Sequence, residues 1–103
     1  MDRVRYRVVV KNGQDVVEEI HKVVVHRFDL GDVEDPELYA AQPLYEWQQS
    51  EAGQFVMTHA IDKPEWHKHM DRMWMGYTYI IVAELEKKKL SEFYLRFDKT
   101  LKL

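Results

Sequence analysis

The sequence predicts a single α+β domain over residues 1–103, with a mostly antiparallel sheet in β-β-α-β-β-β order and one main helix packed on one face. Three observations lead to this prediction. Near the start, a strand-forming run is followed by Asn-Gly and a second β-branched run. A capping signal and helical spacing follow in the middle of the chain. After them comes an almost continuous apolar run that suits a buried strand.

The first predicted element is a strand over residues 3–11, where polar and apolar side chains alternate. One face of this strand carries four apolar side chains: Val4, Tyr6, Val8 and Val10. The opposite face carries the arginines. A second strand over residues 16–25 follows the Asn12-Gly13 turn, so the two strands form a hairpin.

The register of this hairpin depends on the length of its loop. A two-residue loop would pair Val10 with Asp15 and would mix core and solvent faces. A three-residue loop gives two apolar cross-strand pairs: Val10 with Val16, and Tyr6 with Ile20. It also gives two pairs of opposite charge: Lys11 with Asp15, and Arg7 with Glu19. The three-residue loop is therefore predicted.

The main helix is predicted over residues 36–52. Asp35 can cap it, and Pro36 fits its first position. Gly53 is placed to end it. Pro43 has no N–H to donate to the preceding turn, so the helix is either kinked or divided at that residue.

Further strands are predicted after the helix. Residues 54–61 alternate as a strand does, and residues 77–85 suit a central strand covered on both faces. Between them, residues 63–72 form either a short helical turn or a long ordered loop. The last segment, residues 86–101, fits a strand or a helix. The strand is preferred because Phe-Tyr-Leu-Arg-Phe has high strand propensity.

Composition excludes several classes of function. The absence of cysteine removes disulfides, thiolate metal sites and cysteine nucleophiles. The net charge of −3 gives no general attraction for nucleic acid. No apolar run is long enough to span a membrane, and the N-terminus lacks the apolar core of a secretion signal. We expect a soluble, cytoplasmic protein without a cofactor, located in the host cytoplasm if the protein is viral.

The histidines at positions 59, 67 and 69 suggest one alternative, a metal-dependent enzyme that uses His59, His67 and His69. Imidazole is a common ligand of divalent metals, and His67 and His69 share a face if the backbone is extended. If the backbone is helical, they diverge and cannot chelate together. The preferred interpretation is that they are polar residues of a loop, so no metal ion is assigned.

The arginines of the first strand suggest a second alternative. Arg3, Arg5 and Arg7 project from one face at about 7 Å spacing, which is close to the spacing of phosphates on a nucleic-acid strand. The preferred interpretation is that they keep an outer face soluble and pair with acids such as Glu19. Nucleic-acid binding is therefore not the leading hypothesis.

Aromatic and methionine residues gather between positions 66 and 75. The candidate partner-binding residues are Trp66, Met70, Met73, Trp74 and Met75. Trp and Met are enriched at protein interfaces, and a domain of this size cannot bury all of them. We expect this segment to bind a protein partner or a second copy of the chain, most simply as a homodimer.

The block from Leu44 to Met57, with Pro64-Glu65-Trp66 and the residues from Met75 to Tyr79, resembles small uncharacterised proteins of tailed bacteriophages, including phages of marine cyanobacteria. The resemblance implies an origin and an accessory role, and no functional residue is carried over. No phosphate-binding loop or nucleophile motif is present. The leading hypothesis is a non-enzymatic, self-associating interaction protein.

Overall fold

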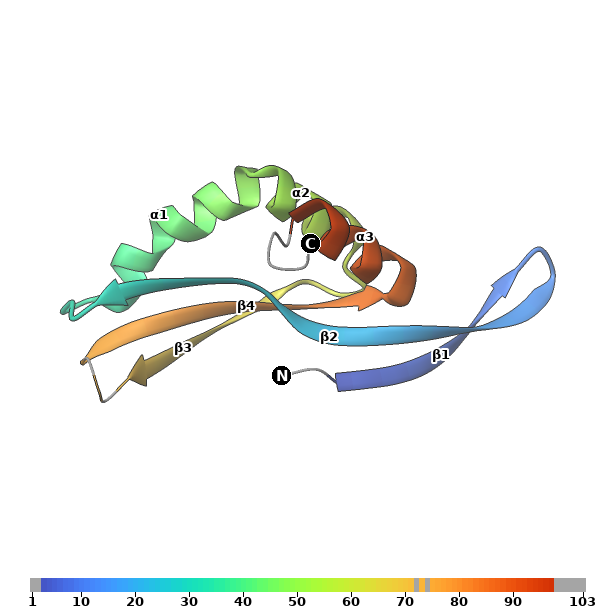
Figure 1. Cartoon of the computed structure of the whole chain (residues 1–103), viewed down its shortest axis with the longest axis horizontal. Helices are drawn as coiled ribbons and strands as arrows, with labels where there is room; N and C mark the ends of the chain where they lie inside the picture. The colour runs from blue at the N-terminus through green and yellow to red at the C-terminus, as the bar shows by residue number, and fades with distance from the viewer. Residues whose placement is uncertain (1–2, 72, 74, 98–103) are drawn as a thin grey trace.

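The structure is a computed structural model that describes residues 3–71, 73 and 75–97 (Figure 1). Its elements are β1 (Arg3–Lys11), β2 (Gln14–Gly31), α1 (Pro36–Gln49), α2 (Glu51–His59), β3 (Glu65–Asp71), β4 (Gly76–Glu86) and α3 (Lys87–Phe97). The predicted α+β class is confirmed. The order is β-β-α-α-β-β-α, so the predicted β-β-α-β-β-β order is wrong.

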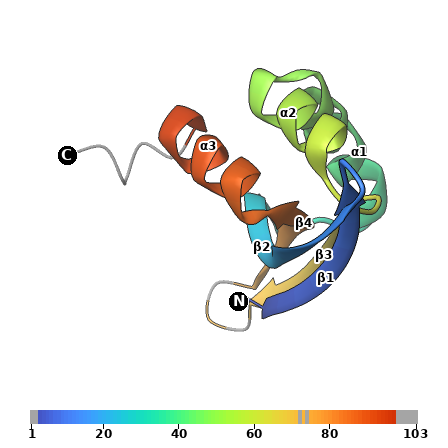
Figure 2. The same ribbon diagram turned by 90° about the vertical axis from the view of Figure 1, so that its right-hand side faces the viewer.

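The four strands form one antiparallel sheet in the order β1-β2-β4-β3. The three helices lie on the same side of this curled sheet, which we call the helix face (Figures 1 and 2). The other side, the open face, carries none of the described helices. Because side chains alternate along a strand, Tyr6 and Val8 point to the helix face, whereas Arg5 and Arg7 point to the open face.

The turn between β1 and β2 has two residues, Asn12-Gly13, with φ angles of 52° and 77°. The predicted three-residue loop is therefore wrong, because Val10 pairs with Asp15 and Tyr6 pairs with Glu19. The prediction assumed that Val10 and Tyr6 face a core. Both are well exposed, so the paired acids remain in contact with water and keep their hydration.

Residues 36–59 form two helices that meet at Ser50. Helix α1 continues through Pro43, so the predicted division at that residue is wrong. The Ser50 hydroxyl donates to the Trp47 carbonyl at 2.6 Å and accepts from the Gly53 N–H at 3.0 Å. It thereby ends α1 and caps α2. Gly53, predicted to end the helix, lies in the first turn of α2.

Most of the predicted strand over residues 54–61 belongs to α2 instead. Phe55 and Val56 are buried, and His59 lies one helical turn after Phe55, with their ring centroids 4.6 Å apart. Alternation over so few residues does not distinguish a strand from a short helix. The cap at Ser50 favours the helix in this segment.

The strand predicted over residues 77–85 is confirmed as β4, which lies between β2 and β3. Neither prediction for residues 63–72 is correct, because residues 65–71 form the edge strand β3. The preferred C-terminal strand is also wrong. Residues 87–97 form α3, whose Leu90 and Phe93 are buried against the sheet. Their spacing is that of one helix face, and burying that face outweighs local strand propensity.

One hydrophobic core lies between the helices and the middle of the sheet. The sheet contributes side chains from β2 and β4: Val23, Ile81, Ala83 and Leu85. The helices contribute Trp47, Phe55, Val56, Leu90 and Phe93. All nine are less than a tenth exposed, so this layer supplies most of the apolar burial that stabilises the fold.

The outer half of the β1–β2 hairpin projects beyond this core (Figure 1). Strand β4 ends at Glu86, opposite Ile20, so in the described chain residues 14–19 of β2 have only β1 as a neighbouring strand. We call residues 4–19 the arm. The molecule measures 54 × 29 × 26 Å, and its radius of gyration of 16.0 Å exceeds the roughly 13 Å of a compact domain of this length.

Among the described residues, no helix combines the length and the apolar character that a membrane span requires. The longest described helix, α1, has 14 residues, fewer than the roughly 20 that cross a bilayer.

Candidate functional site

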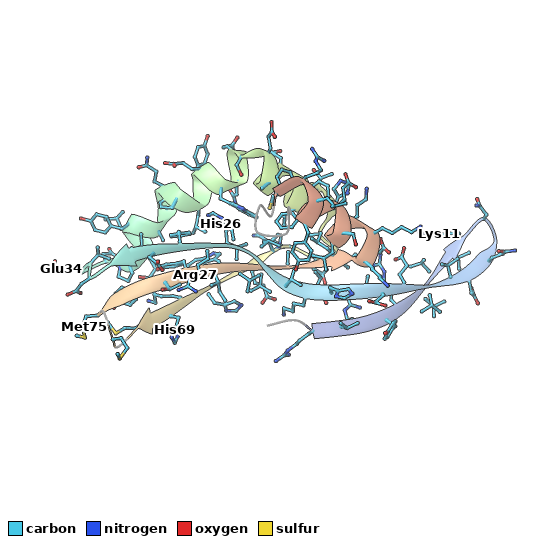
Figure 3. The ribbon with its side chains drawn as sticks, in the orientation of Figure 1. Lys11, His26, Arg27, Glu34, His69 and Met75 are labelled. Carbon is cyan, nitrogen blue, oxygen red and sulfur yellow. The ribbon has the colours of Figure 1, made fainter. Side chains whose placement is uncertain are left out.

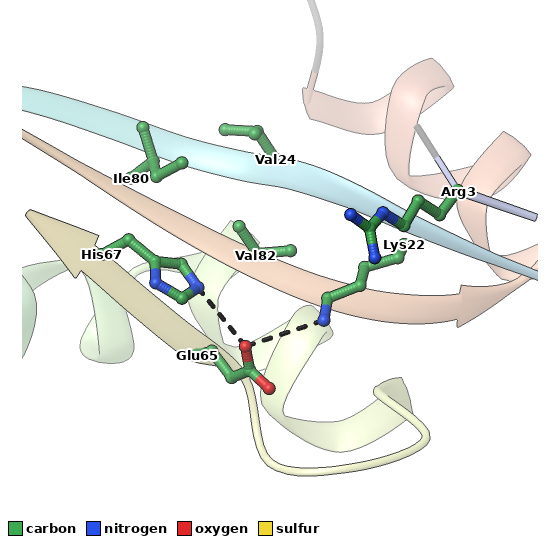
Figure 4. Close-up of a pocket in the computed structure, with 7 residues that line it drawn as sticks. All are labelled: Arg3, Lys22, Val24, Glu65, His67, Ile80 and Val82. Atoms are coloured by element: carbon green, nitrogen blue, oxygen red, sulfur yellow. Dashed lines mark ion pairs between the residues drawn. The ribbon is translucent and has the colours of Figure 1, made fainter. Parts of the chain in front are cut away.

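A groove of about 360 Å³ lies on the open face of the sheet (Figure 4). Three side chains of β2 and β4 form its apolar floor: Val24, Ile80 and Val82. Four polar side chains of β1, β2 and β3 surround them: Arg3, Lys22, Glu65 and His67. The curl of the sheet brings the start of β1 and the start of β3 to this groove, although they belong to opposite edges.

Glu65 organises the charges at the rim of the groove. Its Oε1 atom lies 3.7 Å from Lys22 Nζ and 3.3 Å from His67 Nε2 (Figure 4). Arg3 has no ion-pair partner among the described residues. The rim therefore carries two permanent cations, Arg3 and Lys22, and one carboxylate. None of the seven lining residues has a hydroxyl or thiol group, so the groove offers no such nucleophile.

The structure does not bring the three candidate metal ligands together. His67 and His69 lie on the open face of β3, whereas His59 packs on Phe55 in α2 on the helix side. No group of three His, Asp or Glu side chains that could hold a metal ion occurs in the part of the chain that the structure describes. The metal-dependent enzyme therefore gains no support from the geometry.

The arginines of β1 are on the open face, as predicted, but two of them are engaged by carboxylates. Arg5 donates to Glu84 at 2.7 and 3.1 Å. Arg7 and Lys11 both contact Glu18, each at 2.9 Å. The predicted pairing of Arg7 with Glu19 and of Lys11 with Asp15 is wrong, because the two-residue turn moves Glu18 to the open face.

These ion pairs also change the pKa values of their members. The hydrogen bonds from Arg5 lower the pKa of Glu84 below 4.5, and the same contact raises the pKa of Arg5. Hydrogen bonds from Lys11 and Arg7 lower the pKa of Glu18. Because Arg5 and Arg7 are already paired with carboxylates, they have little charge left to neutralise phosphates, and the geometry disfavours nucleic-acid binding by these two arginines.

Met70, Met73 and Met75 lie at the end of β3 and in the turn to β4, where Met75 is marked in Figure 3, whereas Trp66 is the second residue of β3. The exposed fractions are 46% for Trp66, 44% for Met70, 94% for Met73 and 59% for Met75. Trp74 lies outside the described residues. We call Trp66, Met70, Met73 and Met75 the β3–β4 end. It is an exposed and largely apolar surface.

The start of α1 extends the β3–β4 end. Lys68 of β3 contacts Glu37 of α1 at 2.6 Å, which holds the first turn of α1 against β3. In that turn, Leu38 and Tyr39 are 66% and 58% exposed. The sequence analysis did not single out these two residues as part of a binding surface.

The apolar face of the arm was also missed. Tyr6, Val8, Val10 and Val17 lie on the helix face beyond the end of β4, and Val4 lies on the same face opposite His21. The five side chains are between 48% and 71% exposed. The sequence reasoning placed the four β1 residues in the core. The Asn-Gly turn was the signal against that placement, because its two-residue loop pairs this face with acids.

The chain matches no protein-family model, no curated protein and no solved structure. The resemblance to proteins of tailed bacteriophages therefore stays a prediction.

Proposed function

We propose that this protein is a non-enzymatic interaction protein that self-associates and binds a protein partner through the β3–β4 end. The observation that supports the proposal is the exposure of Met70, Met73 and Met75 around the turn between β3 and β4, with Trp66 exposed on the same face of β3 as Met70. Large apolar side chains gathered in one exposed place are typical of binding surfaces. Trp anchors contacts with a large area, and Met adapts its shape to different partners.

The charges near this surface suggest how a partner is oriented. Lys68 lies between Trp66 and Met70 in sequence and is neutralised by Glu37, and it also lies 5.5 Å from the centre of the Tyr77 ring. The middle of the surface is therefore apolar with an internally balanced charge. Such a centre favours an apolar partner surface over a highly charged one.

Site-specific cross-linking in cells that naturally produce the protein tests this proposal. A photo-reactive amino acid at position 73 should form a covalent adduct with a protein, and the same group at position 95 serves as the control. Leu95 is 74% exposed but lies on α3, away from the β3–β4 end. Adducts at position 73 that are absent at position 95 support the proposal. Equal labelling at both positions, or no adduct at position 73, contradicts it.

A further inference from the structure

The arm has an apolar face that the fold leaves without a covering layer. Val8 of β1 is directly opposite Val17 of β2, and Tyr6 and Val10 flank Val8 along β1. With Val4, these side chains expose on the order of 500 Å² of apolar surface, near the upper end of the largest patches on monomers. Alternate residues of a strand point to the same side, so the β1 side chains form a continuous apolar row. On β2 the acids Asp15 and Glu19 flank Val17 on this face.

A two-stranded ribbon of this kind is only marginally stable in water on its own. In the described chain, residues 14–19 of β2 have no third strand beside them, because the pairing of β2 with β4 starts at Ile20. The described helices also end before the arm (Figure 1). Arg7 and Lys11 pair with Glu18 on the open face, and on the apolar face Glu19 contacts His21 beside Tyr6. None of these contacts covers the valines of the apolar face. A second layer over the apolar face would supply the burial that the ribbon lacks.

We infer that a second copy of this chain supplies that layer, with the two arms packed face to face and antiparallel. In such a pair, a two-fold axis near the Val8–Val17 pair places the tip of one arm over the base of the other. The apolar side chains of each arm then meet the same side chains of its partner. The inference gives the self-association of the proposed function a surface separate from the β3–β4 end.

Charge complementarity supports the second copy as the occupant. Asp15, opposite Val10 near the tip, lies on the apolar face and has no ion-pair partner among the described residues. At the base of the arm, α3 begins at Lys87, directly after the β4 residue that pairs with Ile20. Lys87 and Lys88 are exposed, and neither has an ion-pair partner in the described chain. An antiparallel arrangement places Asp15 of one copy over the Tyr6–Glu19 pair of the other, beside these lysines, and Glu19 is already engaged by His21.

The area is also appropriate for a dimer. Two apolar patches of this size bury about 1,000 Å² together, which is near the lower limit for a specific interface. Contacts between Asp15 and the lysines at the edge add to this area. We therefore expect a dimer whose dissociation is measurable by dilution.

Light scattering and sedimentation of the full chain test the inference. Val8→Glu buries an unpaired charge in the proposed interface and should weaken dimerisation at least about tenfold. Leu95→Glu is the matched control and should leave the dimer intact, since Leu95 is exposed on α3 away from the arm. Val8 is 64% exposed in the single chain, so circular dichroism should show an unchanged fold.

A charge exchange sharpens the test. Asp15→Lys should weaken the dimer, and Lys87→Glu with Lys88→Glu in the same chain should restore it. A protein that is monomeric at every concentration overturns the arm inference and the self-association, while cross-linking at position 73 still tests the partner surface. A dimer that survives Val8→Glu but dissociates on Met70→Glu with Met73→Glu overturns the arm inference alone and places the second copy at the β3–β4 end.

Discussion

Arg5 of β1 donates two hydrogen bonds to the Glu84 carboxylate of β4, across the intervening strand β2, with donor–acceptor distances of 2.7 and 3.1 Å. Ile20, which pairs with Arg5 in β2, is completely buried even though it lies on the open face. The aliphatic parts of the ion pair therefore cover apolar surface that no described helix reaches. On the open face of the sheet, the Arg5–Glu84 ion pair shields Ile20 from water.

Truncation of the Ile20 side chain should lower the free energy of unfolding. Ile20→Ala should lower the free energy of unfolding by about 2–4 kcal/mol, because it leaves a cavity beneath the ion pair. Val8→Ala, at a position that is 64% exposed, should change it by less than about 0.5 kcal/mol in dilute, monomeric protein. Urea unfolding measures both values. Similar losses for the two variants would mean that Ile20 is not shielded as described.

The same ion pair predicts how stability responds to acid. The pKa of Glu84 is lowered in the folded protein, so the folded state binds this proton less tightly than the unfolded state. The pair's contribution is complete above the usual pKa of 4.5 and is lost as the pH falls through the folded-state pKa. Glu84→Gln should therefore be less stable than the wild type near neutral pH, and the difference should shrink in acid. Urea midpoints measured across this range should converge, and parallel curves would contradict the prediction.

The sequence predicted those parts of the fold that depend on local signals. The apolar run at β4 and the cap at Asp35 are two such signals, and Asp35 accepts from the Leu38 N–H at 3.3 Å. Helix α3 could not be chosen over a strand, because Leu90 and Phe93 are placed by the core that they cover. A strand pattern also shows which side chains share a face, but not whether anything covers that face.

The candidate surfaces also divide into those that local sequence signals predict and those that depend on the tertiary structure. The exposure of Trp66 and Met73 was foreseen because a small domain cannot bury every large apolar residue. The arm was not foreseen, because its exposure depends on where β4 ends relative to β2. The groove on the open face was not foreseen either, since it joins residues from both edges of the sheet.

His26 gives a second dependence on pH. It lies on the helix face, where it stacks on Trp47 with ring centroids 5.8 Å apart, and burial lowers its pKa below 6.5. The unfolded chain therefore takes up this proton first as the pH falls. Stability should decrease from pH 6.5 down to the folded-state pKa of His26 and then stop responding to this group. His26→Phe should flatten the response in thermal melts at mildly acidic pH, and an unchanged slope would exclude His26 as its cause.

At Gly53, replacement of glycine by alanine should destabilise the protein, although the same change inside a helix usually stabilises it. Replacing Gly by Ala inside a helix ordinarily stabilises a protein by up to about 1 kcal/mol. A Cβ at Gly53, however, would lie 1.7 Å from the Trp47 carbonyl oxygen at the α1–α2 junction. The backbone must move to accept it, so Gly53→Ala should destabilise the protein by about 1–3 kcal/mol. A stabilised variant in urea unfolding would show that α1 and α2 are not packed this closely.

Tyr79 should tolerate the loss of its hydroxyl group. It is completely buried, its ring stacks on Phe28 with centroids 5.3 Å apart, and its hydroxyl has no hydrogen-bond partner among the described residues. The same burial raises the pKa of Tyr79. A buried hydroxyl without a partner costs about 1–3 kcal/mol, whereas the aromatic ring contributes packing that phenylalanine retains.

Tyr79→Phe should therefore leave the free energy of unfolding unchanged or raise it by about 1 kcal/mol. Tyr6→Phe is the matched control, because the Tyr6 side chain is 65% exposed and its hydroxyl is solvated in the single chain. That change should have no effect on urea unfolding of the monomer. A clear loss of stability for Tyr79→Phe, with none for Tyr6→Phe, would mean that the Tyr79 hydroxyl is hydrogen-bonded in solution beneath α1.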